Sequence, residues 1–326
     1  MALAMPEDGV SKNDSPGEGH PNAPKRRGLI AALLAAMRPK QWTKNLLVFP
    51  ALLFTLDRPH GIAQFESIFS GFALFCLLSS VVYLINDVVD RESDRRHPKK
   101  CRRPIASGEL PVPTAIAAAV VLGIVGLILS FKLSTGFGII ITTYFVLTAG
   151  YSFYFKHIVI LDVLVLAAGF VLRAIAGVAV LHVGISPWFI ECILMLALLL
   201  GLCKRRAELL ATQQAGIVGT RRILEEYSAP MLDQMIVIGA GALLMSYSLY
   251  TVQSETAARH PYLVVTIPFV IYGVFRYLYL MHRRELGEAP DAILIEDKPT
   301  LVNVILYVVV TGFILTHTFH LGIYGR

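Results

Sequence analysis

Long apolar segments alternate with short, charge-rich segments from residue 42 almost to the end of the chain. About 20 apolar residues cross the hydrocarbon core of a bilayer as a helix, and a helix satisfies its own backbone hydrogen bonds there. The pattern therefore predicts an all-α, polytopic membrane protein with about nine transmembrane helices. The predicted spans are residues 42–56, 67–86, 114–131, 135–155, 159–181, 187–203, 232–252, 262–281 and 300–320.

The composition agrees with this class of protein. Hydrophobic residues make up 55% of the 326 positions and charged residues only 16%. Soluble domains usually carry more charge. The sequence contains no Walker loop and no dinucleotide-binding glycine motif, so we expect any chemistry to be built on the ends of the helices. We expect the bilayer to be a partner, and nucleic acid not to be one.

The basic residues indicate an orientation. Most of the 29 Lys and Arg lie in the N-terminal arm and in the loops after the second, fourth, sixth and eighth predicted spans. The opposite side holds only Arg58, Lys132, Arg259 and Arg326. Because cytoplasmic loops are enriched in Lys and Arg, we expect a plasma-membrane protein whose N-terminus and basic loops are cytoplasmic and whose C-terminus is outside.

The N-terminal region differs in character from the rest. Residues 1–28 are rich in Gly, Pro, Ser, Asn and charge, which predicts a disordered arm. Residues 29–41 combine an apolar stretch with basic flanks, so we expect a helix lying on the inner leaflet. Residues 42–326 would then form the transmembrane catalytic domain.

An acidic cluster follows the second predicted span. Asn86, Asp90 and Asp94 recur at i, i+4 and i+8, so a continuous helix would place them on one face with Asp87 at its edge. Carboxylates this close repel one another unless a cation lies among them, and Mg²⁺ prefers such oxygen ligands. The alternative is a solvated acidic helix end. At a bilayer boundary ionisable groups are functional candidates, so the sequence favours a Mg²⁺ site.

Basic residues adjoin this cluster. Residues 95–108 are dense in Lys and Arg, and their guanidinium groups suit phosphate; the alternative is an anchor for anionic headgroups. For the aromatic loop near residue 154 the alternative is an interface belt with a snorkelling lysine. In the loop after the sixth span, Glu208 could pair with a lysine four positions earlier. The substrate-binding candidates are Lys40, Lys44, Asn45, Arg91, Arg102, Arg103, Tyr151, Lys156, Arg173, Lys204 and Arg205.

Arg173 is unusual among these candidates because it lies inside the fifth predicted span. An intramembrane arginine is costly unless it is paired or faces a polar cavity. Two interpretations stay open. Arg173 neutralises a buried partner such as Glu191, or it meets an anionic headgroup.

The run Asn-Asp-x-x-Asp-x-x-x-Asp at residues 86–94, within a predicted nine-helix protein, resembles the UbiA superfamily of intramembrane prenyltransferases. The resemblance covers nearly everything after residue 38 and implies a helical bundle with a cytoplasm-facing active site. It implies that Asn86, Asp87, Asp90 and Asp94 form the Mg²⁺-binding motif, and that Tyr151 and Lys156 form a Tyr/Lys element. Most members have a second Asp-rich motif after the sixth span, whereas this chain reads Lys-Arg-Arg-Ala-Glu at residues 204–208.

Three segments, residues 38–45, 97–108 and 156–164, resemble one branch of the superfamily, the actinobacterial decaprenyl-phosphate phosphoribosyltransferases. This resemblance implies transfer of phosphoribose from phosphoribosyl pyrophosphate to a polyprenyl phosphate, on the path to the arabinose donor of the cell wall. Two alternatives are prenyl transfer to a quinone precursor or haem, and a non-enzymatic transporter or scaffold with a cation site. The sequence is compatible with a homo-oligomer.

In the first of these roles, the catalytic residues would be Asp87, Asp90 and Asp94. One Mg²⁺ on Asp90 and Asp94, with Asn86 or Asp87, would hold the leaving pyrophosphate. The acceptor phosphate is already ionised at neutral pH, so no general base is required. The basic residues would hold the sugar phosphate and the lipid phosphate, with Lys44, Arg102, Arg103 and Lys156 as the first candidates.

Overall fold

The computed structural model describes residues 27–53, 61–97, 100–214, 222–284 and 297–317, and every regular element in these ranges is a helix. Eight helices are long and apolar enough to cross a membrane, and they match the second to ninth predicted spans within a few residues at most ends. They are α3 (Ile62–Val89), α6 (Val112–Leu133), α7 (Thr135–Phe153), α8 (Leu161–Leu181), α9 (Pro187–Gln214), α10 (Ala229–Gln253), α12 (Ile267–Arg284) and α14 (Lys298–Thr316).

Short helices join or precede these long ones. The expected helix at residues 29–41 is present as the shorter α1, and residues 1–26 of the expected disordered arm lie outside the described residues. The short α-helices are α1 (Leu29–Ala36), α2 (Pro50–Leu53), α4 (Arg91–Arg96), α5 (Pro104–Ser107) and α11 (Glu255–Arg259). The 3₁₀ helices are η1 (Pro39–Val48), η2 (Lys100–Arg102), η3 (Phe155–His157), η4 (Arg222–Glu226) and η5 (Pro261–Thr266).

The first predicted span, residues 42–56, is not one continuous α-helix. The ten residues of η1 and the four of α2 take its place, and residues 54–56 lie outside the described part of the chain. Pro39 and Pro50 open these two elements, and a proline cannot donate the backbone hydrogen bond that would continue a preceding helix. A 3₁₀ run of this length is uncommon. In the described part of the chain, eight of the nine expected spans are long helices, and the first expected span is a broken segment.

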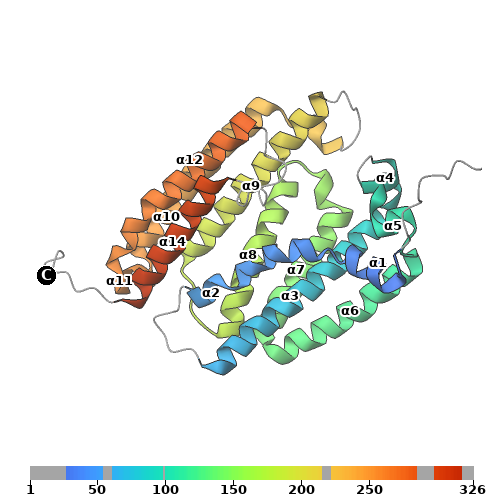
Figure 1. Ribbon diagram of the computed structural model, residues 1–326, viewed down its shortest axis with the longest axis horizontal. Helices are drawn as coiled ribbons and strands as arrows, with labels where there is room; N and C mark the ends of the chain where they lie inside the picture. The colour runs from blue at the N-terminus through green and yellow to red at the C-terminus, as the bar shows by residue number, and fades with distance from the viewer. Residues whose placement is uncertain (1–26, 54–60, 98–99, 215–221, 285–296, 318–326) are drawn as a thin grey trace, which may run out of the picture.

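The long helices form two groups that lie side by side (Figure 1). One group contains α3, α6, α7 and α8, and the other contains α9, α10, α12 and α14. The contact between α8 and α9 joins the groups. Each group has its own apolar core, the first built around Phe75 and Phe137 and the second around Leu199 and Leu280. Because α2 and η1 pack against α8, the broken first segment belongs to the first group.

The end of η1 approaches α8 closely at Gly177. A Cβ atom on Gly177 would lie 2.0 Å from the backbone oxygen of Val48, a distance that no real side chain tolerates. The absence of a side chain at this position therefore allows η1 to lie directly on α8. The other end of η1 begins beside Arg38, whose side chain reaches α3. The segment thus connects the core of the first group to the end of α3.

Candidate active site

The acidic motif lies at a break between two helices. α3 ends at Val89, Asp90 is its C-cap residue, and α4 begins at Arg91. The sequence predicted one continuous helical face, so this detail of the prediction is wrong. Backbone hydrogen bonds of helical spacing continue across the break. The Asp90 amide donates to the Asn86 carbonyl and the Asp94 amide donates to the Asp90 carbonyl, both over 2.8 Å. The break leaves Asp94 buried and Asp90 half-buried.

Each carboxylate of the motif is paired with a basic side chain. Arg38 donates to Asp87 Oδ1. Arg103 Nη1 donates to the same oxygen over 3.2 Å and to Asp94 Oδ2 over 2.5 Å. Lys156 Nζ donates to Asp90 Oδ1 over 2.6 Å. These cations come from three different segments, so the structure brings together residues far apart in sequence, including the predicted candidates Arg103 and Lys156.

The donor chemistry of this cluster fits a hard divalent cation. Asp87 is only 2% exposed, and its Oδ2 atom is buried without a hydrogen-bond partner. A buried carboxylate oxygen without a partner is costly, and its lone pairs are available to a cation. Among the described residues no three acidic side chains converge as a ready metal-binding group. Asp87, Asp90 and Asp94 could therefore hold Mg²⁺ once their basic partners have moved, with the Asn86 amide as a further oxygen donor.

Arg38 belongs to the cluster although it was absent from the predicted substrate-binding set. Its backbone is left-handed, with φ of 54°, and its guanidinium lies 5.0 Å from the centroid of the Tyr83 ring. A non-glycine residue in this conformation is strained, and such strain concentrates at functional sites. Two signals in the sequence point to this residue: it opens the segment 38–45 that carries the resemblance, and the following Pro39 disfavours a continued α-helix at the residue before it.

A second polar cluster lies where α8 and α9 meet η4. Arg205 Nε donates to Asp162 Oδ2 over 2.6 Å, and Nη1 donates to Glu208 Oε2 over 2.5 Å. The Tyr227 hydroxyl donates to Asp162 Oδ1 over 2.7 Å and accepts from the Ile160 amide over 2.7 Å. Burial raises the pKa of the Tyr227 phenol to about 12, so it stays a donor at neutral pH. The predicted candidate Arg205 is therefore engaged inside the protein.

The second cluster contacts the backbone of Ile160, the residue immediately before α8. Ile160 has φ of 70° and ψ of −46°, which is strained for a β-branched residue. The Tyr227 hydroxyl holds its amide in place. Ile160 follows η3, which carries Lys156 to Asp90. This turn could not be predicted from the sequence, because neither Gly nor Asn occupies its left-handed position.

Arg173 lies in neither cluster. Its guanidinium donates to Asn45 Oδ1 over 2.8 Å, to the Tyr144 hydroxyl over 2.9 Å and to the Gly169 carbonyl over 2.7 Å. No acidic side chain among the described residues pairs with Arg173, so the pairing with Glu191, one of the two interpretations left open from the sequence, is not observed. Asn45, another predicted substrate-binding residue, is itself 1% exposed and donates to Ser79 Oγ over 3.1 Å. Both candidates lie in the packed core of the first group of helices.

The remaining predicted substrate-binding residues differ in how exposed they are. Lys40, Arg102 and Lys204 are exposed, whereas Lys44 and Arg91 are half-buried. Tyr151 accepts a hydrogen bond from Arg205 Nη2 over 3.3 Å and so belongs to the second cluster. The ion pairs of the acidic motif among the described residues are those of Arg38, Arg103 and Lys156, and the three exposed candidates make none of them.

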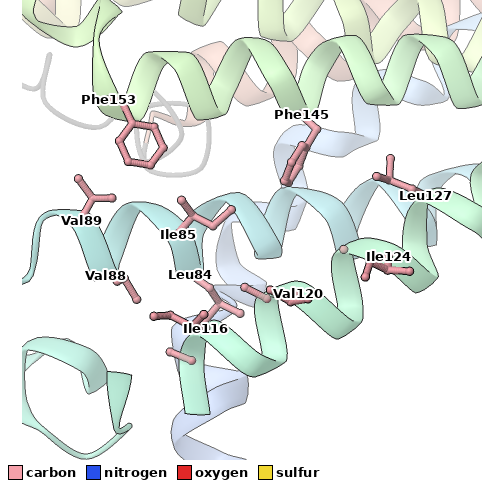
Figure 2. Close-up of a pocket in the computed structure, with 13 residues that line it drawn as sticks. Leu84, Ile85, Val88, Val89, Ile116, Val120, Ile124, Leu127, Phe145 and Phe153 are labelled. Carbon is pink, nitrogen blue, oxygen red and sulfur yellow. The ribbon is translucent and has the colours of Figure 1, made fainter. Parts of the chain in front are cut away.

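An apolar groove of about 530 Å³ lies between α6 and α7, with the last turns of α3 as its floor. Figure 2 shows Phe145 and Phe153 of α7 facing Ile116 and Val120 of α6 across it. Val89, the last residue of α3, lines its end. The lining is apolar throughout, and Asp87 and Asp90 do not contribute to it. The groove is therefore a surface for hydrocarbon beside the charged site.

The fold and the charged cluster define a polytopic helical membrane protein with three carboxylates and three basic side chains paired at one end of a helical bundle. The chain belongs to the UbiA prenyltransferase family, whose sequence model matches residues 47–295. The predicted fold class and family are thereby confirmed.

Two relatives with assigned names are similar over most of their length. The chain is 34% identical to decaprenyl-phosphate phosphoribosyltransferase of Corynebacterium glutamicum, over 86% of each chain. It is 33% identical to the protein of the same name from Mycolicibacterium smegmatis, over 86% of this chain and 91% of the relative.

Solved structures support the fold. A UbiA homolog from Archaeoglobus fulgidus bound to GPP and Mg²⁺ has a TM-score of 0.67, with 18% identity over 87% of this chain and 99% of the other. Another UbiA homolog, from Aeropyrum pernix, has a TM-score of 0.56 with 12% identity, over 88% of this chain and 97% of the other. At these sequence identities the structural similarity is evidence for the fold alone.

Proposed function

We propose that this protein transfers the 5-phosphoribosyl group of phosphoribosyl pyrophosphate to a polyprenyl phosphate, such as decaprenyl phosphate, and releases pyrophosphate. The observation that carries the proposal is the interleaving of Asp87, Asp90 and Asp94 with Arg38, Arg103 and Lys156. Carboxylates suit Mg²⁺ and the basic groups suit phosphate oxygens. The names of the relatives supply the transferred group and the acceptor, and phosphoribosyl pyrophosphate is proposed as the donor.

In this reaction the bond between the sugar anomeric carbon and the diphosphate oxygen breaks, and its electron pair leaves with the diphosphate. A bond forms between the same carbon and an oxygen of the lipid phosphate. Mg²⁺, when bound, neutralises the charge that grows on the leaving group. Asp87, Asp90 and Asp94 would hold that ion, and Arg38, Arg103 and Lys156 would orient the phosphates. The acceptor phosphate is already an anion, so no side chain has to remove a proton.

The membrane setting suits this pair of substrates. The eight long helices indicate a multi-pass membrane protein, and a lipid acceptor reaches such a site from the bilayer. We propose that the end carrying the acidic motif and the N-terminus face the cytoplasm, where a soluble phosphorylated sugar is available, and that the C-terminus lies outside. The excess of Lys and Arg on the first side supports this orientation in the plasma membrane.

A substrate-swap assay tests the proposal. Purified protein in detergent receives radiolabelled phosphoribosyl pyrophosphate and a polyprenyl phosphate, and label in the organic phase is counted with Mg²⁺ and with EDTA. We expect organic-soluble product only with Mg²⁺. A parallel reaction supplies a prenyl diphosphate with an aromatic acceptor. Consumption of the prenyl diphosphate, with the sugar donor ignored, would overturn the assignment in favour of the prenyl transfer typical of the family.

A further inference from the structure

The apolar groove between α6 and α7 ends at the charged cluster. Val89, the last residue of α3, lines the groove, and the next residue is Asp90. Phe153, the last residue of α7, lines it too, and η3 then carries Lys156. Lys156 Nζ donates to Asp90 Oδ1 over 2.6 Å. This ion pair therefore joins the ends of the two helices just beyond the apolar lining.

The third wall of the groove, α6, follows another member of the charged cluster. α6 begins at Val112, and the short α5 before it begins directly after Arg103, which pairs with Asp94. The side chains of Arg103 and Lys156 are 25% and 20% exposed, so neither is sealed from an incoming anion. An apolar surface with cations at one end is complementary to an amphiphile that has a hydrocarbon chain and an anionic head.

The groove faces outwards from the helical bundle. Ile116, Val120 and Ile124 line it from successive turns of α6, and their side chains are 48%, 54% and 56% exposed. The lining on α6 runs from Ala115 to Leu127, which is about 18 Å along the helix axis at 1.5 Å per residue. A lipid in the bilayer therefore enters the groove sideways, and its chain follows the groove from the charged end to about the middle of the hydrocarbon core.

The dimensions of the groove favour a lipid with a single chain. Phe145 and Phe153 of α7 face Ile116 and Val120 of α6 across it (Figure 2). Because lipid tails are as apolar as these side chains, burial of hydrocarbon alone does not select an occupant, and the selection comes from packing and from the head group. A phospholipid with two chains would leave one of them outside the groove. A single-chain lipid phosphate matches one groove and one cationic end.

We propose that the polyprenyl chain of the acceptor lies in this groove, with its phosphate at Lys156. The proposal rests on the proposed function for the identity of the acceptor. An ammonium group has three donors, and Asp90 takes one of them, so a phosphate oxygen can bind Lys156 while the ion pair stays in place. The groove thus brings the head of the lipid to the acidic motif from the side of α6 and α7.

The first test locates the chain without any sugar donor. A polyprenyl phosphate that carries a diazirine within its first isoprene units is photolysed with the purified full-length protein in nanodiscs, and the labelled peptides are identified by mass spectrometry. We expect labels on residues 115–127 and 145–153. Excess unlabelled polyprenyl phosphate should remove these labels, whereas excess phosphatidylglycerol should leave them.

The second test fills the groove from α6. Val120→Trp places a large ring in the groove, so we expect the KM for polyprenyl phosphate to rise, and photolabelling to fall, by about tenfold, the scale of a misfit in an apolar site. The KM for phosphoribosyl pyrophosphate should not change. Val121→Trp is the matched control, because Val121 is the next residue of the same helix, is 59% exposed and does not line the groove. Its kinetics and labelling should equal those of the wild type.

Three results would overturn the proposal. Labels that phosphatidylglycerol removes as well as polyprenyl phosphate does would show that the groove holds ordinary bilayer lipid. Labels confined to the second group of helices would place the chain elsewhere. Equal labelling of the Val120→Trp and Val121→Trp variants would show that the groove does not hold the chain. Competed labelling of the groove without phosphoribosyl transfer would refute the proposed reaction alone, and transfer without such labelling would refute the groove alone.

Discussion

The guanidinium of Arg173 donates from Nε to Asn45 Oδ1 over 2.8 Å, joining α8 to η1 across 128 positions of sequence. Asn45 in turn donates to Ser79 on α3. One buried arginine therefore fixes η1 against two long helices of the first group. Because Arg38 immediately precedes η1, this core contact also determines where the guanidinium of Arg38 meets Asp87.

Replacing Arg173 with leucine should destabilise the protein. The substitution leaves Asn45 Oδ1 and the Tyr144 hydroxyl without their buried donor, and each such group costs about 1–3 kcal/mol. We expect a lower unfolding temperature in detergent and a smaller loss for Arg173→Lys, which keeps one donor. An unchanged unfolding temperature with selectively weakened binding of lipid phosphate would instead support the headgroup role considered from the sequence.

Gly177→Ala should displace η1 from α8. Its Cβ atom would fall 2.0 Å from the Val48 backbone oxygen, and backbone cannot move aside as a flexible side chain can. We expect lower thermal stability and reduced transfer activity together, because Arg38 would move with η1. Gly241→Ala is the control, since nothing lies within 4 Å of its added Cβ atom and alanine favours the helix. Equal behaviour of the two variants would contradict the close contact.

Eight of the nine spans that the sequence predicted are long helices with approximately the predicted ends, because lipid requires about 20 apolar residues in a helix that satisfies its own backbone hydrogen bonds. The sequence also located the acidic motif, because ionisable groups at a bilayer boundary are functional candidates. It did not predict the partner of each carboxylate. Asp90 meets Lys156 across 66 positions, and no local pattern encodes such a contact. The sequence also did not predict the hydrogen bond between Arg173 and Asn45, because a single charged residue in a span does not indicate which segment packs against it.

Asp94→Asn should reduce transfer activity by about 100-fold or more, the scale seen when one electrostatic group is removed from a catalytic site. The amide keeps the size of the side chain but loses the charge that a metal ion requires. Glu92→Gln on the same short helix is the matched control, because the Glu92 side chain is 69% exposed and lies outside the carboxylate cluster. Product formation at matched protein concentration is the measurement. Equal losses in both variants would point to general electrostatics of α4.

Tyr227→Phe should loosen the turn before α8. The variant removes the acceptor for the Ile160 amide and the donor to Asp162, so about 1–3 kcal/mol of stability should be lost per buried group left unpaired. We expect faster amide exchange around Ile160 and a higher KM for the phosphorylated donor, since Lys156 precedes this turn. Tyr272→Phe, at an exposed tyrosine, serves as the comparison. Unaltered exchange at Ile160 would show that the hydroxyl does not hold the strained turn.

Acid should weaken the attachment of α14. Hydrogen bonds from Arg276 hold the pKa of Asp297 well below its usual range, and Asp297 also caps α14 through Thr300. The folded pKa lies below the unfolded value, so this stabilisation is complete above the usual carboxyl range near pH 4 and is lost as pH falls below it. The unfolding temperature should decrease between pH 7 and about pH 3.5, and this decrease should be larger for the wild type than for Asp297→Asn. Equal decreases would show that other groups dominate acid sensitivity.

The pairing of Asp87, Asp90 and Asp94 with Arg38, Arg103 and Lys156 also bears on how the protein is made. A nascent chain that delivers three carboxylates to the bilayer boundary brings charges that are costly there unless they are paired. Here the later segments η2 to η3 arrive with two of the required cations. Once these segments are in place, the three carboxylates at this end of the bundle are balanced by cations of the same chain.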